Sequence, residues 1–177
     1  MRLERSTATL LIIDIQQKLM PVIDRADDVI RNIDRLVRGC HLLGVPALLT
    51  EQYVKGLGPT VDVVRRAFEE TFGYAPMEKA CFSALDAVRH LARRQVIVAG
   101  VETHVCVHQT VIDLLANGFE VALVADAVSS RTAENRSIAL QRLTSEGAKL
   151  TSTEMALFEL CVVSGTDEFR AISRLVK

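Results

Sequence analysis

Residues 8–14 read Ala-Thr-Leu-Leu-Ile-Ile-Asp, an apolar run of strand length that ends in a carboxylate. Apolar residues without polar alternation are typical of a strand buried on both faces, as in a parallel sheet. Two similar runs follow, Val-Pro-Ala-Leu-Leu-Thr at residues 45–50 and Gln-Val-Ile-Val-Ala-Gly at residues 95–100. We therefore expect a strand over residues 9–13, inside a sheet that is covered on both faces.

Segments with helical spacing alternate with these runs. Apolar residues recur at helical spacing over residues 27–43, and Gly44 follows where that helix is expected to end. Similar patterns predict helices over 61–68, 84–93, 104–117 and 134–146, strands over 119–125 and 148–151, a loop over 53–60, and helical segments after residue 151. Repeated strand–helix units indicate the α/β class, as a three-layer α/β/α sandwich with a mainly parallel, Rossmann-like sheet of about six strands. Because the chain shows no linker, repeat or low-complexity stretch, residues 1–177 are expected to form a single domain.

The composition argues against several classes of partner. The formal net charge is −1 and the sequence pI is about 6.4, so no strong field points to nucleic acid or to an anionic membrane. No apolar run approaches the roughly 20 residues that span a bilayer, and the N-terminal residues lack the long apolar region of a signal peptide. We expect a cytoplasmic protein that acts on a small molecule.

The four cysteines are Cys40, Cys81, Cys106 and Cys161. An even number permits two disulfides, but the spacings are irregular and the chain is rich in core residues. Free thiols in a reducing compartment are the preferred interpretation. No C-x-x-C pair is present, which argues against a zinc ribbon or a thioredoxin-like site.

In open α/β sheets, ligands bind at the carboxyl ends of the strands. That rule draws attention to Asp14, to residues 50–52, to the region of Lys79, to residues 101–106 and to Asp126.

Three of these residues carry chemistry, each with a structural alternative. Asp14 closes a buried strand, where a carboxylate costs free energy unless it is paired, although Asp also caps helices. Cys106 lies at a strand-to-helix junction, where the helix dipole lowers a thiol pKa and backbone N–H groups stabilise an oxyanion, although most free cysteines are small core residues. Lys79 would stabilise a thiolate or a carboxylate, or would be an ordinary surface lysine. Together they supply a nucleophile, a base and a cation, as amide or acyl hydrolysis requires.

Other residues are weaker candidates. His104 and His108 are spaced i, i+4 but lack a third metal ligand. Cys81 lies two residues from Lys79, and core packing is its preferred role. Asp126 is interpreted as an anchored carboxylate in a structural turn.

Several segments resemble those of the isochorismatase-like cysteine hydrolases, and most closely those of the isochorismatase domain-containing proteins. They are residues 10–16 (Leu-Leu-Ile-Ile-Asp-Ile-Gln), Lys79 with Phe82-Ser83, residues 100–107 (Gly-Val-Glu-Thr-His-Val-Cys-Val), the loop over 50–60, and residues 126–131 and 151–154. The motifs occur in family order over nearly the whole chain.

The resemblance implies a Rossmann-like parallel sheet and a homo-oligomer, dimeric or higher. It implies that Cys106 is the nucleophile, Asp14 the base that takes its proton, and Lys79 the residue that balances charge. It also implies a non-proline cis peptide between Val101 and Glu102, which turns backbone N–H groups, including that of Cys106, towards the substrate oxyanion. The residues we place in the substrate pocket are Gln16, Tyr53, Phe82 and Val105.

Differences between this sequence and two better-known groups of the superfamily restrict the activities that we expect. Nicotinamidases resemble this fold but carry an Asp and several His as metal ligands after the second strand, whereas residues 50–55 here contain no histidine. We therefore expect no metal and no other cofactor. True isochorismatases lack the nucleophilic cysteine.

The predicted function is a cysteine-dependent hydrolase that cleaves a C–N bond of a small amide through a thioester. One alternative is a catalytically weak binding protein, or a redox-sensitive interaction protein, that uses the accessible thiol. The other is an isochorismate-type ether hydrolase, whose activity would survive the loss of Cys106.

Overall fold

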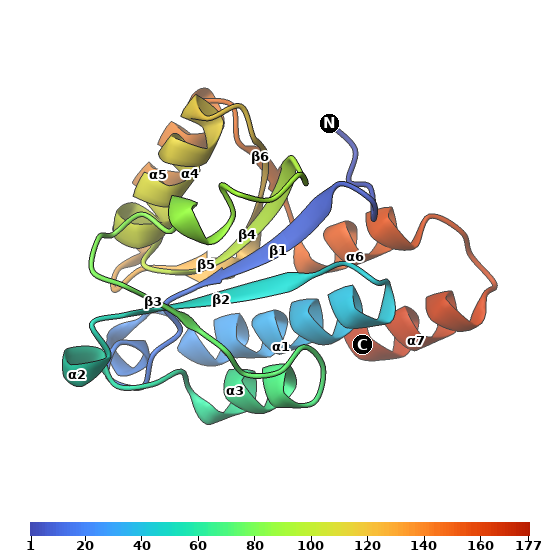
Figure 1. The fold of residues 1–177 in the computed structure, drawn as a ribbon, viewed down its shortest axis with the longest axis horizontal. Helices are drawn as coiled ribbons and strands as arrows, with labels where there is room; N and C mark the ends of the chain where they lie inside the picture. The colour runs from blue at the N-terminus through green and yellow to red at the C-terminus, as the bar shows by residue number, and fades with distance from the viewer.

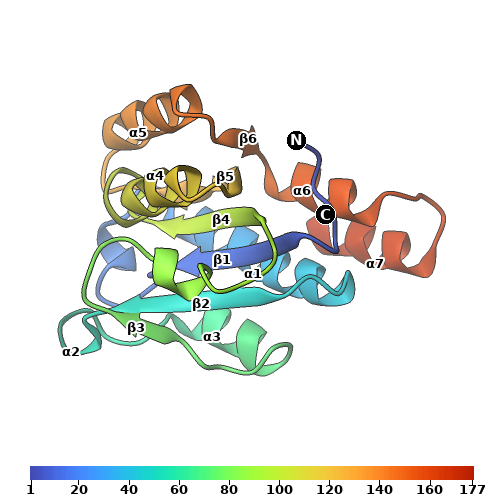
Figure 2. The same cartoon turned by 45° about the horizontal axis from the view of Figure 1, so that its top comes forward.

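The computed structural model describes residues 1–177, which form a six-stranded sheet with helices on both faces. The strands are β1 (Ala8–Ile13), β2 (Ala47–Gln52), β3 (Met77–Lys79), β4 (Gln95–Val101), β5 (Glu120–Ser129) and β6 (Lys149–Thr151). Their order across the sheet is β3-β2-β1-β4-β5-β6, as Figure 2 shows, and every neighbouring pair is parallel. The predicted fold class is confirmed.

The helices complete a three-layer sandwich. They are α1 (Ala26–Leu42), α2 (Val54–Leu57), α3 (Asp62–Glu69), α4 (His108–Ala116), α5 (Ala133–Ser145), α6 (Thr153–Cys161) and α7 (Asp167–Val176), with shorter helical turns at Met20–Val22, Leu85–Ala87 and Thr103–Val107. Helices α1, α3, α6 and α7 pack on one face of the sheet, and α4 and α5 pack on the other (Figure 1). None of these helices combines the length and the apolar character needed to cross a membrane.

The position of β1, covered on both faces, explains why its sequence shows no alternation of polar and apolar residues. All six of its residues are buried. Leu10 and Ile12 belong to the core under α1, whereas Leu11 and Ile13 belong to the core under α4. Since successive side chains of a strand point to opposite faces, both sets must be apolar when both faces are covered.

Several elements differ from the prediction. The helix expected over residues 84–93 is wrong, because only a single turn, Leu85–Ala87, forms there. Ala84, Ala87 and Val88 are the fully buried residues of this segment, and an apolar stripe of one turn does not sustain a helix. The predicted loop over 53–60 contains the one-turn helix α2, and β5 continues past residue 125 to Ser129. A register shift between Val98 and Gly100 of β4 accompanies this extension.

Gly100 brings β4 close to β1 just before Asp14. Its φ is +128°, and an added Cβ would lie 2.2 Å from the carbonyl oxygen of Ile13, its partner in the sheet. Only glycine fits such an approach without displacing the backbone. The close contact fixes the separation of the two strand ends that carry the candidate site.

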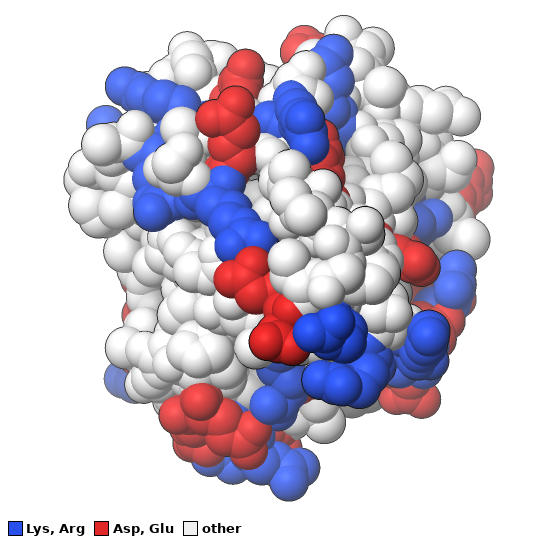
Figure 3. Space-filling view, turned by 90° about the vertical axis from the view of Figure 1, so that its right-hand side faces the viewer, with Lys and Arg blue, Asp and Glu red and all other residues white.

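The surface carries charges of both signs. Figure 3 shows Lys and Arg side chains interspersed with Asp and Glu on one face, with broad uncharged areas between them. This mixture agrees with the formal net charge of −1.

Candidate active site

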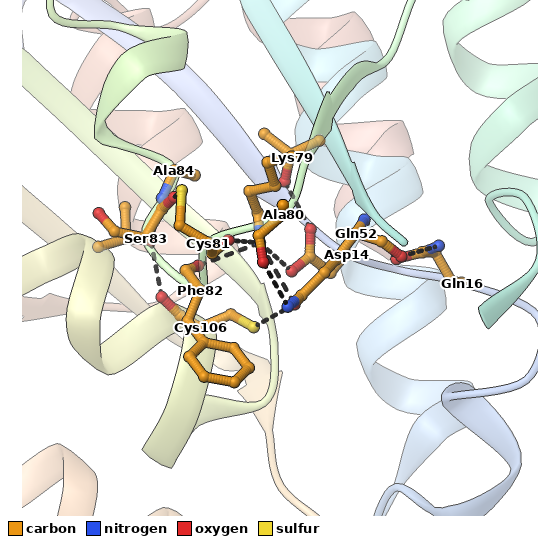
Figure 4. A network of polar contacts seen from close by, with 12 residues as sticks. Asp14, Gln16, Gln52, Lys79, Ala80, Cys81, Phe82, Ser83, Ala84 and Cys106 are labelled. Atoms are coloured by element: carbon orange, nitrogen blue, oxygen red, sulfur yellow. Dashed lines mark hydrogen bonds and ion pairs between the residues drawn. The ribbon is translucent and has the colours of Figure 1, made fainter. Parts of the chain in front are cut away.

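Side chains from neighbouring strand ends meet in one cluster. Asp14 directly follows β1, Lys79 is the last residue of β3, and Cys106 lies in the helical turn after β4 (Figure 4). The carboxyl ends of parallel strands lie at one edge of the sheet, so residues far apart in sequence are brought together there.

Asp14 and Lys79 form a buried ion pair. Lys79 Nζ donates to Asp14 Oδ2 at 2.6 Å, and the two side chains are 0% and 6% exposed, respectively. The hydroxyl of Thr50 donates to the other carboxylate oxygen at 2.7 Å. Lys79 also donates to the carbonyl oxygens of Phe82 at 3.0 Å and Cys81 at 3.3 Å. Lys79 is therefore not a surface lysine, and the buried Asp14 carboxylate is paired as its position requires.

The Cys106 thiol is buried and hydrogen-bonded. The residue is 5% exposed, and its Sγ–H donates to Gln52 Oε1 at 3.1 Å. Burial and, next, the nearby Asp14 carboxylate raise the pKa of this thiol, Lys79 lowers it, and the net pKa is about 12. The expectation of a lowered pKa is wrong, because loss of hydration and the neighbouring carboxylate outweigh the cation and the helix terminus. The resting residue is a neutral thiol.

Gln52 is the site residue that sequence reasoning missed. It ends β2, and its Oε1 lies between the Cys106 thiol and Lys79 Nζ, at 3.1 Å and 3.5 Å. The strand-end rule pointed to residues 50–52, but nothing in a glutamine's identity separates it from its neighbours there.

The residues expected in the substrate pocket differ in position. Gln16 is fully buried, and its amide bonds to the backbone of Gln52 and of Gly58, so it supports the site and does not face an open pocket. Tyr53 and Phe82 are 66% and 47% exposed, and Val105 is partly buried. These three side chains remain pocket candidates beside the buried cluster.

The segment before Cys106 is held by a second carboxylate. The Val101–Glu102 peptide bond is cis. Glu102 is 5% exposed; its Oε2 accepts from the backbone N–H and the Nε of Arg131, both at 3.0 Å, and its Oε1 accepts from Nη2 at 2.6 Å. The Arg131 guanidinium lowers the pKa of the Glu102 carboxyl.

The weaker candidates have structural surroundings. His104 Nδ1 contacts Ser130 Oγ at 2.9 Å, and no three His, Cys, Asp or Glu side chains are grouped as metal ligands. Asp126 lies inside β5, not at its end, and its Oδ1 accepts from the backbone N–H of Thr153 at 2.8 Å. Asp126 is thus an anchored carboxylate that holds the start of α6, as predicted, but the predicted structural turn is wrong because β5 continues through this residue.

All four cysteines are free, as predicted. Cys81 is exposed and is not a core residue, because it follows β3 in an irregular segment. A surface cleft of about 560 Å³ lies between α5 and Leu150, and Cys106 is not among its lining residues.

Comparison with known proteins identifies the family. Residues 8–155 match the isochorismatase domain. The chain belongs to the isochorismatase family. The protein is thus an isochorismatase-family hydrolase, as the resemblance of its motifs implied.

Two curated isochorismatase relatives are similar over nearly the whole chain. The secreted isochorismatase effector Isc1 of Phytophthora sojae is 39% identical, over 99% of this chain and 87% of the relative. The isochorismatase domain-containing protein 2 of Danio rerio is 38% identical, over 99% of this chain and 89% of the relative.

Two solved structures share the isochorismatase fold. The MAR1 ribonuclease of Caenorhabditis elegans superposes with a TM-score of 0.91 at 32% identity, over 99% of this chain and 92% of that one. The YcaC gene product of Escherichia coli, described as an octameric hydrolase of unknown specificity, gives a TM-score of 0.88 at 26% identity, over 98% and 88% of the two chains.

Proposed function

We propose that this isochorismatase-family hydrolase cleaves the C–N bond of a small amide through a thioester on Cys106. The observation that carries the proposal is the convergence of a thiol, a buried carboxylate and a buried ammonium from different strand ends. Nucleophilic hydrolysis needs these three groups within reach of one another.

The resting thiol requires a base. With burial raising the pKa of Cys106 to about 12, a preformed thiolate is scarce at neutral pH. We propose that the S–H proton passes to Asp14 as sulfur bonds to the carbonyl carbon, whose C=O electrons move to oxygen. Lys79 then keeps the charge of the pair balanced, and backbone N–H groups near Glu102 and Cys106 stabilise the oxyanion.

Collapse of the tetrahedral intermediate breaks the C–N bond. Asp14 returns its proton to the leaving nitrogen, and a thioester remains on Cys106. Water then attacks the thioester with Asp14 as base, which releases the acid and regenerates the thiol. No cofactor enters this sequence.

The charge balance of the cluster favours an uncharged substrate. Lys79 is paired with Asp14, Arg131 is paired with Glu102, and the thiol is neutral at rest. A charged substrate would lose its hydration without gaining a free partner. Tyr53, Phe82 and Val105 offer apolar contact instead.

The decisive experiment is a screen of small neutral amides for ammonia or amine release, with Cys106→Ala beside the wild type. Turnover by the wild type, loss in Cys106→Ala and an acyl adduct on Cys106 in mass spectra are the expected results. Cys81→Ala, which alters an exposed thiol, is the matched control. Full turnover by Cys106→Ala would overturn the mechanism and favour ether hydrolysis.

An untouched amide library, together with capture of a partner protein by the wild type, would favour the binding or redox-sensitive alternative. An RNA substrate belongs in the same screen, because one relative is described as a ribonuclease. RNA cleavage would contradict the prediction that the protein does not act on nucleic acid.

We also propose a homo-oligomer, supported by the octameric description of the E. coli relative, and light scattering tests it. The single domain over 1–177 and the cytoplasmic location stay predictions, and one relative is described as secreted.

A further inference from the structure

The amide of Gln52 is placed to control the Cys106 proton. Its Oε1 accepts from Cys106 Sγ–H at 3.1 Å and lies 3.5 Å from Lys79 Nζ (Figure 4). An ammonium only donates hydrogen bonds, so the end of the amide that faces Lys79 must be the oxygen. The same oxygen therefore accepts the hydrogen bond from the Cys106 thiol.

The backbone of Gln52 is fixed by a fully buried side chain. Gln16 Oε1 accepts from Gln52 N at 2.8 Å, and Gln16 Nε2 donates to Gln52 O at 2.9 Å. One side-chain amide thus occupies both backbone hydrogen-bonding groups of Gln52. By contrast, Gln52 Nε2 has only a 3.5 Å contact with the carbonyl oxygen of Ala80. The backbone of Gln52 is thus held by Gln16, and its side-chain amide is held mainly through the oxygen that contacts Cys106 and Lys79.

We propose that Gln52 is a positioning residue that holds the resting Cys106 as a neutral thiol, with its amide oxygen as an acceptor for the S–H that competes with the Asp14 carboxylate. The hydrogen bond between Gln52 and Cys106 is present whether or not the protein hydrolyses an amide. The consequence for catalysis rests on the proposed function, in which Asp14 is the base.

A hydrogen bond to the protonated form of an acid disfavours its ionisation. Gln52 Oε1 therefore competes with the Asp14 carboxylate for the thiol proton. Transfer to Asp14 requires the S–H bond to turn from one acceptor to the other. A substrate amide N–H that donates to Gln52 Oε1 would occupy the competing acceptor and so promote that turn.

The test measures alkylation of Cys106 by iodoacetamide against pH, with each modified cysteine identified by mass spectrometry. Gln52→Met keeps the length of the side chain and removes the acceptor. A neutral hydrogen bond contributes about 0.5–1.5 kcal/mol, so the rate–pH curve of Cys106 is expected to move to lower pH by roughly 0.5–1 unit. Gln52→Glu puts a carboxylate beside the sulfur, and its curve is expected to move to higher pH.

Two references accompany the measurement. Cys81, exposed in the same chain, reports general reactivity, and Gln141→Met makes the same substitution at an exposed position away from the site. Thermal unfolding of each variant shows whether it is folded. Opposite displacements for the two Gln52 variants, with Gln141→Met unchanged, support the proposal.

Curves that coincide with the wild type for folded Gln52→Met and Gln52→Glu would overturn it, and so would a shift of Gln52→Met to higher pH. The two proposals fail separately. If Gln52 controls the alkylation curve but no amide is hydrolysed, the positioning role stands and the proposed function falls. If amides are hydrolysed while the curves coincide, the reverse holds.

Discussion

The Asp14–Lys79 pair gives the sharpest test of how the site is held together, through the variant Lys79→Met. The substitution keeps an apolar stem and removes the ammonium, which leaves Asp14 with Thr50 as its remaining side-chain partner. At 2.6 Å and an effective dielectric constant of about 20, the Coulomb attraction is roughly 6 kcal/mol, most of which offsets the cost of burying both charges.

The observable loss is that of breaking a buried pair, about 3–5 kcal/mol. We expect the lower end, about 3 kcal/mol, because the hydrogen bond from Thr50 to the carboxylate survives. Urea unfolding at pH 7, followed by circular dichroism at a fixed protein concentration, measures it. Lys55→Met is the matched control, since Lys55 is exposed and makes no side-chain hydrogen bond or ion pair.

A double variant separates the ion pair from general packing. Asp14→Asn removes the carboxylate charge, so Lys79→Met combined with Asp14→Asn should be more stable than Lys79→Met alone by about 1–3 kcal/mol, because no unpaired charge stays buried. A loss below about 1 kcal/mol for Lys79→Met would place the pair among surface salt bridges. That result, or a double variant no more stable than the single, would refute the reasoning.

Three further variants test the support of the site. Gly100→Ala adds a Cβ 2.2 Å from the carbonyl oxygen of Ile13 at a φ of +128°; we expect a loss of about 3 kcal/mol or more in urea unfolding, and a loss under 1 kcal/mol would contradict the close approach. Gln16→Leu leaves the backbone N–H and carbonyl of Gln52 without their side-chain partner. The expected loss in free energy of unfolding is about 1–3 kcal/mol in the same assay, and an unchanged urea midpoint would contradict it. Arg131 lowers the pKa of Glu102, so its stabilisation is fully present above the ordinary value of 4.5 and is lost as pH falls through the folded value. As pH falls from above 4.5, Arg131→Met should therefore lose less stability than the wild type, and parallel stability–pH curves would refute this.

Much of the architecture was predictable because it depends on local pattern. The uninterrupted apolar run before Asp14 indicated a strand covered on both faces, and β1 is buried throughout. Alternation of such runs with helical spacing then indicated a parallel sheet. The prediction failed over residues 84–93, where helical propensity had no long apolar face to bury.

The sequence by itself determined the parallel sheet with its flanking helices, because periodicity is a local property of the chain. The strand-end rule drew attention to Asp14, Lys79 and Cys106, and the family resemblance supplied their expected roles. Only the tertiary structure decided that Gln52 Oε1 accepts a hydrogen bond from the Cys106 thiol, that Gln16 holds the Gln52 backbone, and that burial raises the pKa of Cys106. These outcomes depend on desolvation and on contacts between residues tens of positions apart. The desolvation and these contacts are both set by how the strand ends pack, and residue identity alone does not specify that packing.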